Sequence, residues 1–263
     1  MEHRLKNKVI WLTGASSGIG EALALELARC GSVLALTSRS EDRLKSVVDN
    51  IRSIGGKAFA FPADVTKQEE LTAAVKNINE NIGDIDILVA NAGTHIFTVP
   101  EAFDSKEYLG LLDINFGGML RSIEAVLGKM YAKQNGHIVV VASMAGFRGV
   151  PRAGAYGASK AAMIHFMESI RFHLVRKGIK VTIVNPGFVK TPLTDKNDFY
   201  MPFLVSAEYS ARIIVKGIEK NKKQIDFPWP FNWMLHFMRV CPYFLYEFII
   251  DKLWKLTEKT EKK

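Results

Sequence analysis

The chain has 263 residues, of which 48% are hydrophobic and 24% charged, and its net charge is +8. This composition predicts a globular protein with a sizeable core and excludes a largely disordered chain. The positive charge is compatible with an anionic partner, but no block rich in lysine and arginine carries interleaved aromatics, so nucleic-acid binding is not expected.

Apolar runs rich in valine and isoleucine alternate with segments of helical period. Such continuous runs are typical of strands that are covered on both faces. The expected strands are Val9–Leu12, Val33–Leu36, Ala58–Phe61, Ile85–Ala90, His137–Ala142, Val181–Val184 and Gln224–Phe227. The expected helices are Glu21–Arg29, Arg43–Ile54, Leu71–Ile82, 154–177 and Ala207–Ile218. This order predicts an α/β fold, a single-domain doubly wound parallel sheet (Rossmann fold) over residues 1–227, with an aromatic-rich C-terminal helical extension over 228–263.

A glycine-rich turn joins the first strand to the first helix. Glycine tolerates positive φ and allows close approach of a ligand, and a helix N-terminus favours an anion such as a pyrophosphate. A purely structural turn would use the same glycines, so the functional interpretation depends on the position after the first strand. The expected cofactor contacts here are Gly14, Ser16, Ser17, Gly18, Ile19 and Gly20.

The second strand ends in Thr37-Ser38-Arg39-Ser40. Sites selective for NAD carry an acidic residue at this place, which binds the ribose 2′-hydroxyl. Here the acid is missing, and Arg39 could bind a 2′-phosphate through its planar donors, with Ser38 as a secondary donor. The alternative is an ordinary solvated arginine. We therefore expect NADP(H) in preference to NAD(H).

Tyr156 and Lys160 lie four residues apart and so share one face of the expected helix. A neighbouring cation favours a phenolate, but such a pair is in isolation more typical of a plain surface contact. Its significance comes from Ser143, just beyond the fifth strand, and from Asn115, in the preceding helical segment.

Together these residues resemble the short-chain dehydrogenase/reductase family in its form of roughly 250 residues. The turn matches TGxxxGxG, and Asn115, Ser143, Tyr156 and Lys160 match the family's catalytic tetrad in order. Further matches are Asn91-Ala92-Gly93 to the NAG motif, Pro186 to Thr191 to the PGxVxT segment, and Asp64-Val65 to the adenine-contacting pair. Asp64 could equally cap a helix that starts near Lys67.

The resemblance implies a hydride transfer between nicotinamide and a carbonyl or secondary alcohol. Tyr156 would donate a proton, Lys160 would lower the pKa of Tyr156 and bind the nicotinamide ribose, and Ser143 would polarise the carbonyl. Asn115 would hold a water in a proton relay. The nicotinamide would be gripped by Pro186, Gly187, Val189 and Thr191. The alternative is a catalytically silent NADP(H)-binding sensor or scaffold, against which the intact Tyr156 and Lys160 argue.

The expected substrate is bulky and lipophilic, sterol-like or long-chain acyl, because aromatic residues are numerous around the expected pocket. Besides Ser143, the expected substrate contacts are Phe97, Phe147, Phe199, Tyr200 and Phe203. The six histidines lack ligand spacing, so no metal is expected. The two cysteines, Cys30 and Cys241, are interpreted as buried thiols.

The extension 228–263 is rich in Trp, Phe and Tyr, but charges interrupt it too often for a membrane-spanning helix. Two interpretations remain open. The segment covers the pocket or a subunit interface, or it is an interfacial anchor whose terminal lysines face anionic lipid, namely Lys255, Lys259, Lys262 and Lys263. The charged N-terminus lacks a secretory signal, so a cytoplasmic protein is expected, and the resemblance implies a homodimer or homotetramer.

Overall fold

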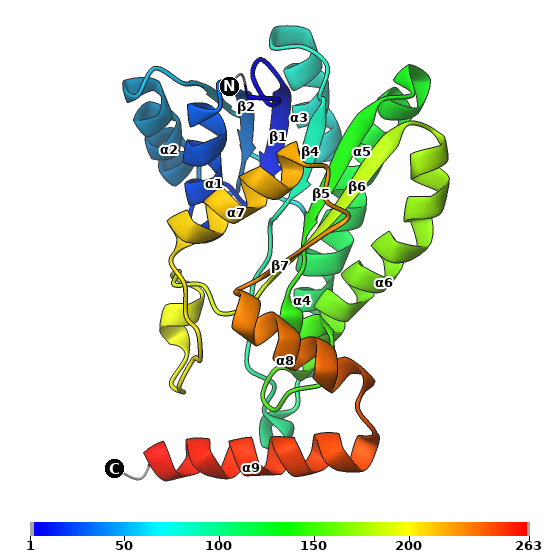
Figure 1. Cartoon of the computed structure of the whole chain (residues 1–263). Coiled ribbons are helices and arrows are strands. Elements are labelled where there is room, and N and C mark those ends of the chain that lie inside the picture. The colour runs from blue at the N-terminus through cyan, green and yellow to red at the C-terminus, as the bar shows by residue number, and fades with distance from the viewer. Residues whose placement is uncertain (1–2, 262–263) are drawn as a thin grey trace.

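The computed structural model describes residues 3–261, apart from the side chains of residues 230, 231, 235 and 253–261. One parallel sheet has the strand order β3-β2-β1-β4-β5-β6-β7 (Figure 1). The strands are β1 (Val9–Thr13), β2 (Val33–Thr37), β3 (Lys57–Ala60), β4 (Ile87–Ala90), β5 (Gly136–Val141), β6 (Ile179–Pro186) and β7 (Gln224–Phe227). The predicted doubly wound parallel sheet is confirmed.

Helices cover both faces of this sheet (Figure 1). One core contains apolar side chains of α1 (Gly18–Arg29), α2 (Glu41–Ser53) and α7 (Ala207–Glu219), and the other contains those of α3 (Gln68–Asn81), α5 (Gly118–Lys133) and α6 (Gly154–Arg176). Strands β1, β2, β4, β5 and β6 are almost wholly buried between them, which is why they read as continuous apolar runs, whereas the edge strand β3 is mostly exposed.

The strand order reverses between β1 and β4, which pair directly with each other. In a doubly wound sheet, ligands bind at the carboxyl ends of the strands beside such a reversal. The glycine-rich turn follows β1, and Asn91 follows β4, so the two segments meet at this point. The topology therefore gathers the sequence motifs at one edge of the sheet.

The elements differ from their predicted bounds mainly at polar ends. Helix α3 begins at Gln68 because its first turn is polar and adds no apolar period to the sequence. Strand β6 extends beyond the predicted Val181–Val184 because its flanking residues continue the pairing with β5 and β7. The sequence pattern did not delimit α4 (Ser105–Leu112), α5 or the π-helical turn Asp113–Gly117 that joins them.

The C-terminal extension, which was predicted to be helical, forms α8 (Trp229–Val240) and α9 (Tyr243–Glu261). Helix α8 contacts β7 through His236, whose Nε2 lies 2.8 Å from Asp226 Oδ2. Met238 of α8 and Cys241, which follows the helix, are buried. No helix among the described residues is long and apolar enough to cross a membrane.

Candidate active site

The glycine-rich turn is packed so closely that no Cβ fits at Gly14 or Gly20. Gly14 and Gly18 have φ of +68° and +58°, the left-handed region that favours glycine. A Cβ on Gly14 would lie 2.7 Å from Ala92 Cα, and a Cβ on Gly20 would overlap the Gly14 carbonyl oxygen. Asn91 Nδ2 donates to that same oxygen at 3.0 Å. The turn is thus held against the end of β4 with its backbone open to a ligand.

A groove of about 450 Å³ runs from this turn along the carboxyl ends of the strands. Most of the predicted cofactor residues line it, namely Gly14, Ser17, Gly18, Ile19, Gly20, Asn91, Gly93, Tyr156, Lys160, Pro186, Gly187, Val189 and Thr191. The glycine cradle, the first turn of α1 and the buried lysine suit the pyrophosphate, ribose and nicotinamide of a dinucleotide.

Six predicted cofactor residues do not line the groove: Ser16, Ser38, Arg39, Asp64, Val65 and Ala92. Ser38 is buried, and its hydroxyl donates to the Ser40 carbonyl at 3.3 Å. Val65 packs against Gly118 of α5. The side chains of Ser38 and Val65 are therefore engaged in local contacts.

Arg39 is exposed at the end of β2, and its charge acts on Asp64. Burial acts to raise the pKa of Asp64, but hydrogen bonds from Thr66 and the charge of Arg39 lower it overall. Asp64 Oδ1 accepts from both the backbone N and the hydroxyl of Thr66 at 2.9 Å. Asp64 does not serve as the N-cap of α3, a position that Lys67 occupies.

Arg43 lines the groove, although the sequence analysis did not select it. It lies in the first turns of α2, and its Nε donates to Ser40 Oγ at 3.1 Å. The available signal was its position in the first turn of the helix that follows Arg39. Two guanidinium groups therefore stand at the end of β2.

Lys160 is 4% exposed, and its Nζ donates to the Val141 carbonyl at 3.0 Å. Burial lowers the pKa of this ammonium to about 8. Gly93 lies beside this group: a Cβ there would be 3.1 Å from Asn115 Oδ1 and in ordinary contact with Nζ, at 3.5 Å. Lys160 thus presents a cation with little hydration to the floor of the groove.

Tyr156 lies one helical turn before Lys160, whose Nζ is 5.7 Å from the centre of the phenol ring. Burial raises the pKa of Tyr156 above its ordinary 10, and a hydrogen bond with Ser143 works in the opposite direction. The net direction is opposite to the lowering expected from Lys160, because a buried phenolate loses its hydration. The neutral phenol that results is the form that can donate a proton.

Ser143 is positioned by the end of β5. Its Oγ accepts from Ala145 N at 3.1 Å and lies 3.5 Å from the Pro186 carbonyl at the end of β6. The hydroxyl therefore sits between the two strand ends and beside Tyr156, where it can donate to a carbonyl oxygen.

Asn115 is fully buried in the π-helical turn. Its Oδ1 accepts from Thr94 N at 2.8 Å, and its Nδ2 donates to the Thr94 carbonyl and to Ser159 Oγ, both at 3.0 Å. Since both amide protons are used, the side chain ties the segment after β4 to α6. It holds the helix that carries Tyr156 and Lys160 in place.

A second, mainly apolar pocket of about 240 Å³ adjoins the groove. Of the predicted substrate residues, Phe97, Phe199 and Ser143 line it, together with Tyr156. The other three lie elsewhere: Phe147 is buried against His236 of α8, with ring centres 4.9 Å apart, and Tyr200 and Phe203 are 77% and 51% exposed. Their aromatic character suggested a pocket wall. Instead, Phe147 packs against α8, and the segment between β6 and α7 leaves Tyr200 and Phe203 exposed.

The pocket also contains residues that the sequence analysis did not assign to it. His95 meets the Tyr156 ring edge-on at 4.9 Å, and burial lowers the pKa of His95, so it is neutral near pH 7. Phe188 contacts Phe199, with centres 5.9 Å apart. Arg152 lies over the Phe97 ring at 4.4 Å and pairs with both oxygens of Asp198.

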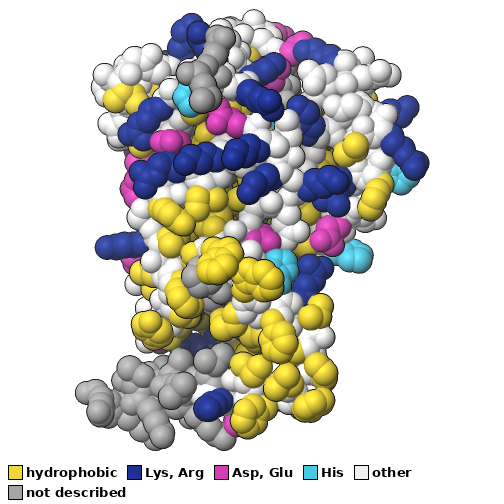
Figure 2. Space-filling model, viewed as in Figure 1, with side chains coloured by type: hydrophobic (Ala, Val, Ile, Leu, Met, Phe, Trp, Pro, Cys, Tyr) yellow, Lys and Arg dark blue, Asp and Glu magenta, His cyan; other side chains and the backbone are white. Residues whose placement is uncertain are grey.

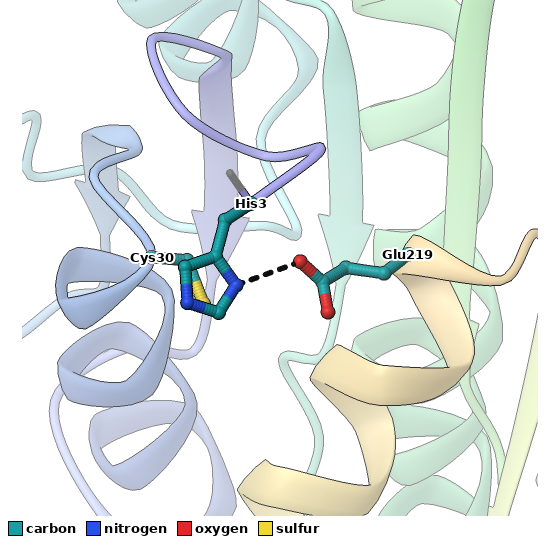
Figure 3. Close-up of side chains that lie close together, drawn as sticks. All are labelled: His3, Cys30 and Glu219. Carbon is teal, nitrogen blue, oxygen red and sulfur yellow. Dashed lines mark hydrogen bonds and ion pairs between the residues drawn. The ribbon is translucent and has the colours of Figure 1, made fainter. Parts of the chain in front are cut away.

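The described residues contain one group that could hold a metal ion: His3, Cys30 and Glu219, whose ligand atoms lie within 4.8 Å of one another (Figure 3). His3 Nδ1 is 3.0 Å from Glu219 Oε1. Burial raises the pKa of the Cys30 thiol to about 11, which agrees with a buried thiol. The group joins the ends of α1 and α7 at the amino edge of the sheet, opposite Tyr156, so it does not serve the groove.

Comparisons with known proteins give a consistent result. A family model described as short chain dehydrogenase matches residues 8–199. An uncharacterised oxidoreductase of Myxococcus xanthus is 36% identical over 88% of this chain and 91% of its own. An 11-beta-hydroxysteroid dehydrogenase of Pinus massoniana is 33% identical over 87% of this chain and 69% of its own. The crystal structure of an actinorhodin polyketide ketoreductase variant with NADPH aligns with a TM-score of 0.77 at 28% identity, covering 84% of this chain and 95% of that one.

Proposed function

This chain belongs to the short-chain dehydrogenase family and is an oxidoreductase for CH–OH or carbonyl groups, and on that premise we propose that it reduces a bulky lipophilic ketone with NADPH. One observation carries the proposal. Ser143 and Tyr156 line both the dinucleotide groove and the apolar pocket. Their hydroxyls therefore stand where a carbonyl in the pocket would meet a cofactor in the groove.

Each side chain where the groove meets the apolar pocket has its own role in the proposed reduction. The bound cofactor would supply hydride to the carbonyl carbon. Ser143 donates a hydrogen bond to the carbonyl oxygen and polarises it. Tyr156 donates its phenolic proton to the same oxygen, and the ammonium of Lys160, one helical turn away, stabilises the phenolate that is left. Asn115 acts as a positioning residue through its bonds to Thr94 and Ser159.

The preference for NADPH is supported by charge at the end of β2. No carboxylate follows the strand within Ser38-Arg39-Ser40, and Arg39 is joined there by Arg43. Guanidinium groups bind phosphate oxygens in pairs, whereas a carboxylate at this place would repel a 2′-phosphate. The solved structure with NADPH reported above supports the same choice of cofactor.

The lipophilic substrate is supported by the pocket walls. Phe97, Phe188 and Phe199 form an aromatic side, and Met144 and Val150 contribute aliphatic surface. Polar groups converge at the inner end, at Ser143 and Tyr156, as expected for a site that orients one carbonyl of an otherwise apolar molecule. The relative that is named a hydroxysteroid dehydrogenase is consistent with a ketone of that size.

A turnover screen with NADPH and NADH tests this proposal. Ketones of graded size, from acetone-like to steroid-like, should show kcat/KM rising with apolar size and higher with NADPH. A preference for NADH would refute the cofactor assignment, and a preference for small hydrophilic ketones would refute the substrate class. A silent sensor has no observation in its favour, because Ser143, Tyr156 and Lys160 are all present and brought together.

A further inference from the structure

Helix α8 has one side that belongs to the core. His236 is bonded to Asp226, Met238 and Cys241 are buried, and the ring of Phe147 lies against His236. These contacts fix the orientation of the helix on the sheet. The opposite side is thereby turned outward, although it too is apolar.

This outward side continues into α9 and forms what we call the outer aromatic face. Its members are 52% to 79% exposed: Trp229, Trp233, Phe237, Val240, Tyr243, Phe244 and Phe248. Figure 2 shows hydrophobic side chains gathered over this end of the molecule, whereas Lys and Arg gather over the other end. A contiguous exposed patch of this kind marks an interaction surface, because water contact with so many large apolar side chains is unfavourable.

Charges of both signs border this face. Glu247 and Asp251 lie on α9, whereas the only charged residue of α8 is Arg239, which lies 3.8 Å from Glu168. Arg148 lies over the rings of Tyr246 and Tyr243 at 4.5 and 5.6 Å, and Arg239 lies 5.5 Å from the centre of the Phe147 ring. Exposed Trp and Tyr with arginines at their margin match the layer of lipid head groups, where aromatic rings and phosphates are neighbours.

A second copy of the chain fits this face less well. A twofold contact between two outer aromatic faces would remove the charges of Arg148 and Arg239 in both copies from water, which costs free energy. A groove between α5 and α6, lined by Leu127, Tyr131 and Phe166, offers a separate apolar surface for self-association.

The outer aromatic face is joined to the substrate pocket. The Tyr246 hydroxyl donates to the Gly149 carbonyl, and Arg148 is held between the α9 tyrosines. The next residues of the same loop, Val150 to Arg152, form a wall of the pocket. The helices that would meet a lipid surface therefore pack directly on the loop that bounds the substrate site.

We infer that α8 and α9 bind the surface of an anionic lipid bilayer and that the substrate reaches the pocket from that bilayer. The second part rests on the proposed function, and the first does not. Surface binding needs no spanning segment, and the described residues contain none. The terminal lysines that were expected to face lipid, Lys255, Lys259, Lys262 and Lys263, lie outside the described side chains.

Flotation of the full chain with phosphatidylcholine vesicles, with and without phosphatidylglycerol, tests the inference. The triple variant Trp229→Ser/Trp233→Ser/Phe237→Ser removes the centre of the face. The matched control Phe172→Ser/Val175→Ser removes two side chains on α6 that are 66% and 57% exposed. The parent and the control should float with the anionic vesicles, and the triple variant should bind at least about tenfold more weakly.

Equal flotation of parent and triple variant would overturn the inference, as would failure of the parent to float. A parent dimer that the triple variant converts to a monomer, without flotation, would make the face a self-association surface instead. Turnover of a water-soluble ketone should be the same in all three proteins. If all three lacked turnover while flotation followed the expected order, the proposed function would fail and the lipid surface would stand.

Discussion

Replacing Lys160 with methionine should reveal the energetic cost of burying its charge. Burial lowers the pKa of the ammonium from 10.5 to about 8, which corresponds to about 3 kcal/mol at neutral pH. The folded protein holds this proton less tightly than the unfolded chain does. The cost is therefore fully present below pH 8 and fades as the pH rises toward 10.5, so Lys160 makes the wild-type protein more stable with rising pH in that window.

Methionine has no charge to bury, so its protein lacks this pH dependence. The free energy of unfolding of Lys160→Met minus that of the wild type should fall by about 2 to 3 kcal/mol between pH 7 and pH 10. The lost bond to the Val141 carbonyl shifts both ends of the series equally, because a neutral amine also donates.

Urea unfolding followed by circular dichroism at four pH values measures this difference. Lys45→Met, which removes an exposed lysine of α2, corrects for losing a surface charge. A difference that stayed constant from pH 7 to pH 10 would show that the Lys160 ammonium is hydrated, and would refute the claim that the groove holds a cation with little hydration.

Three further variants test separate parts of the site. Gly20→Ala should abolish NADPH binding in a fluorescence titration of folded protein, because the new Cβ overlaps the Gly14 carbonyl; retained affinity would contradict this. Arg43→Ala should weaken NADPH about tenfold and NADH little, and equal losses would remove its phosphate role. Asp198→Asn should raise KM for bulky ketones several-fold at similar kcat, because it frees Arg152 from its place over Phe97; an unchanged KM would count against that wall.

Much of the fold could be predicted from sequence because its signals are local. The central strands β4 and β5 are buried on both faces and read as uninterrupted apolar runs, and the edge strand β7 was predicted with its observed bounds. The π-helical turn at Asp113–Gly117 could not be predicted, since a shift in backbone bonding leaves no apolar period. The same turn is what brings Asn115 to Thr94 and Ser159.

Sequence motifs predicted most residues of the groove, whereas no motif predicted the residues of the apolar pocket. A motif names residues whose backbone positions are fixed by one turn or one helix. The pocket depends on how a loop folds back, which sends Phe199 inward and Tyr200 outward although they are neighbours in sequence. His95 was missed because its role comes from contact with Tyr156, not from spacing among histidines.

The proton donor is the central claim, and Tyr156→Phe tests it most directly. The measurement is ketone-dependent NADPH oxidation by the variant, with NADPH affinity determined on the same protein. The phenol supplies a proton that the ring alone cannot, so kcat should fall by at least about a hundredfold while NADPH still binds. Turnover unchanged from that of the wild type would contradict the account, because the reaction would then proceed without the hydroxyl that borders both the groove and the pocket.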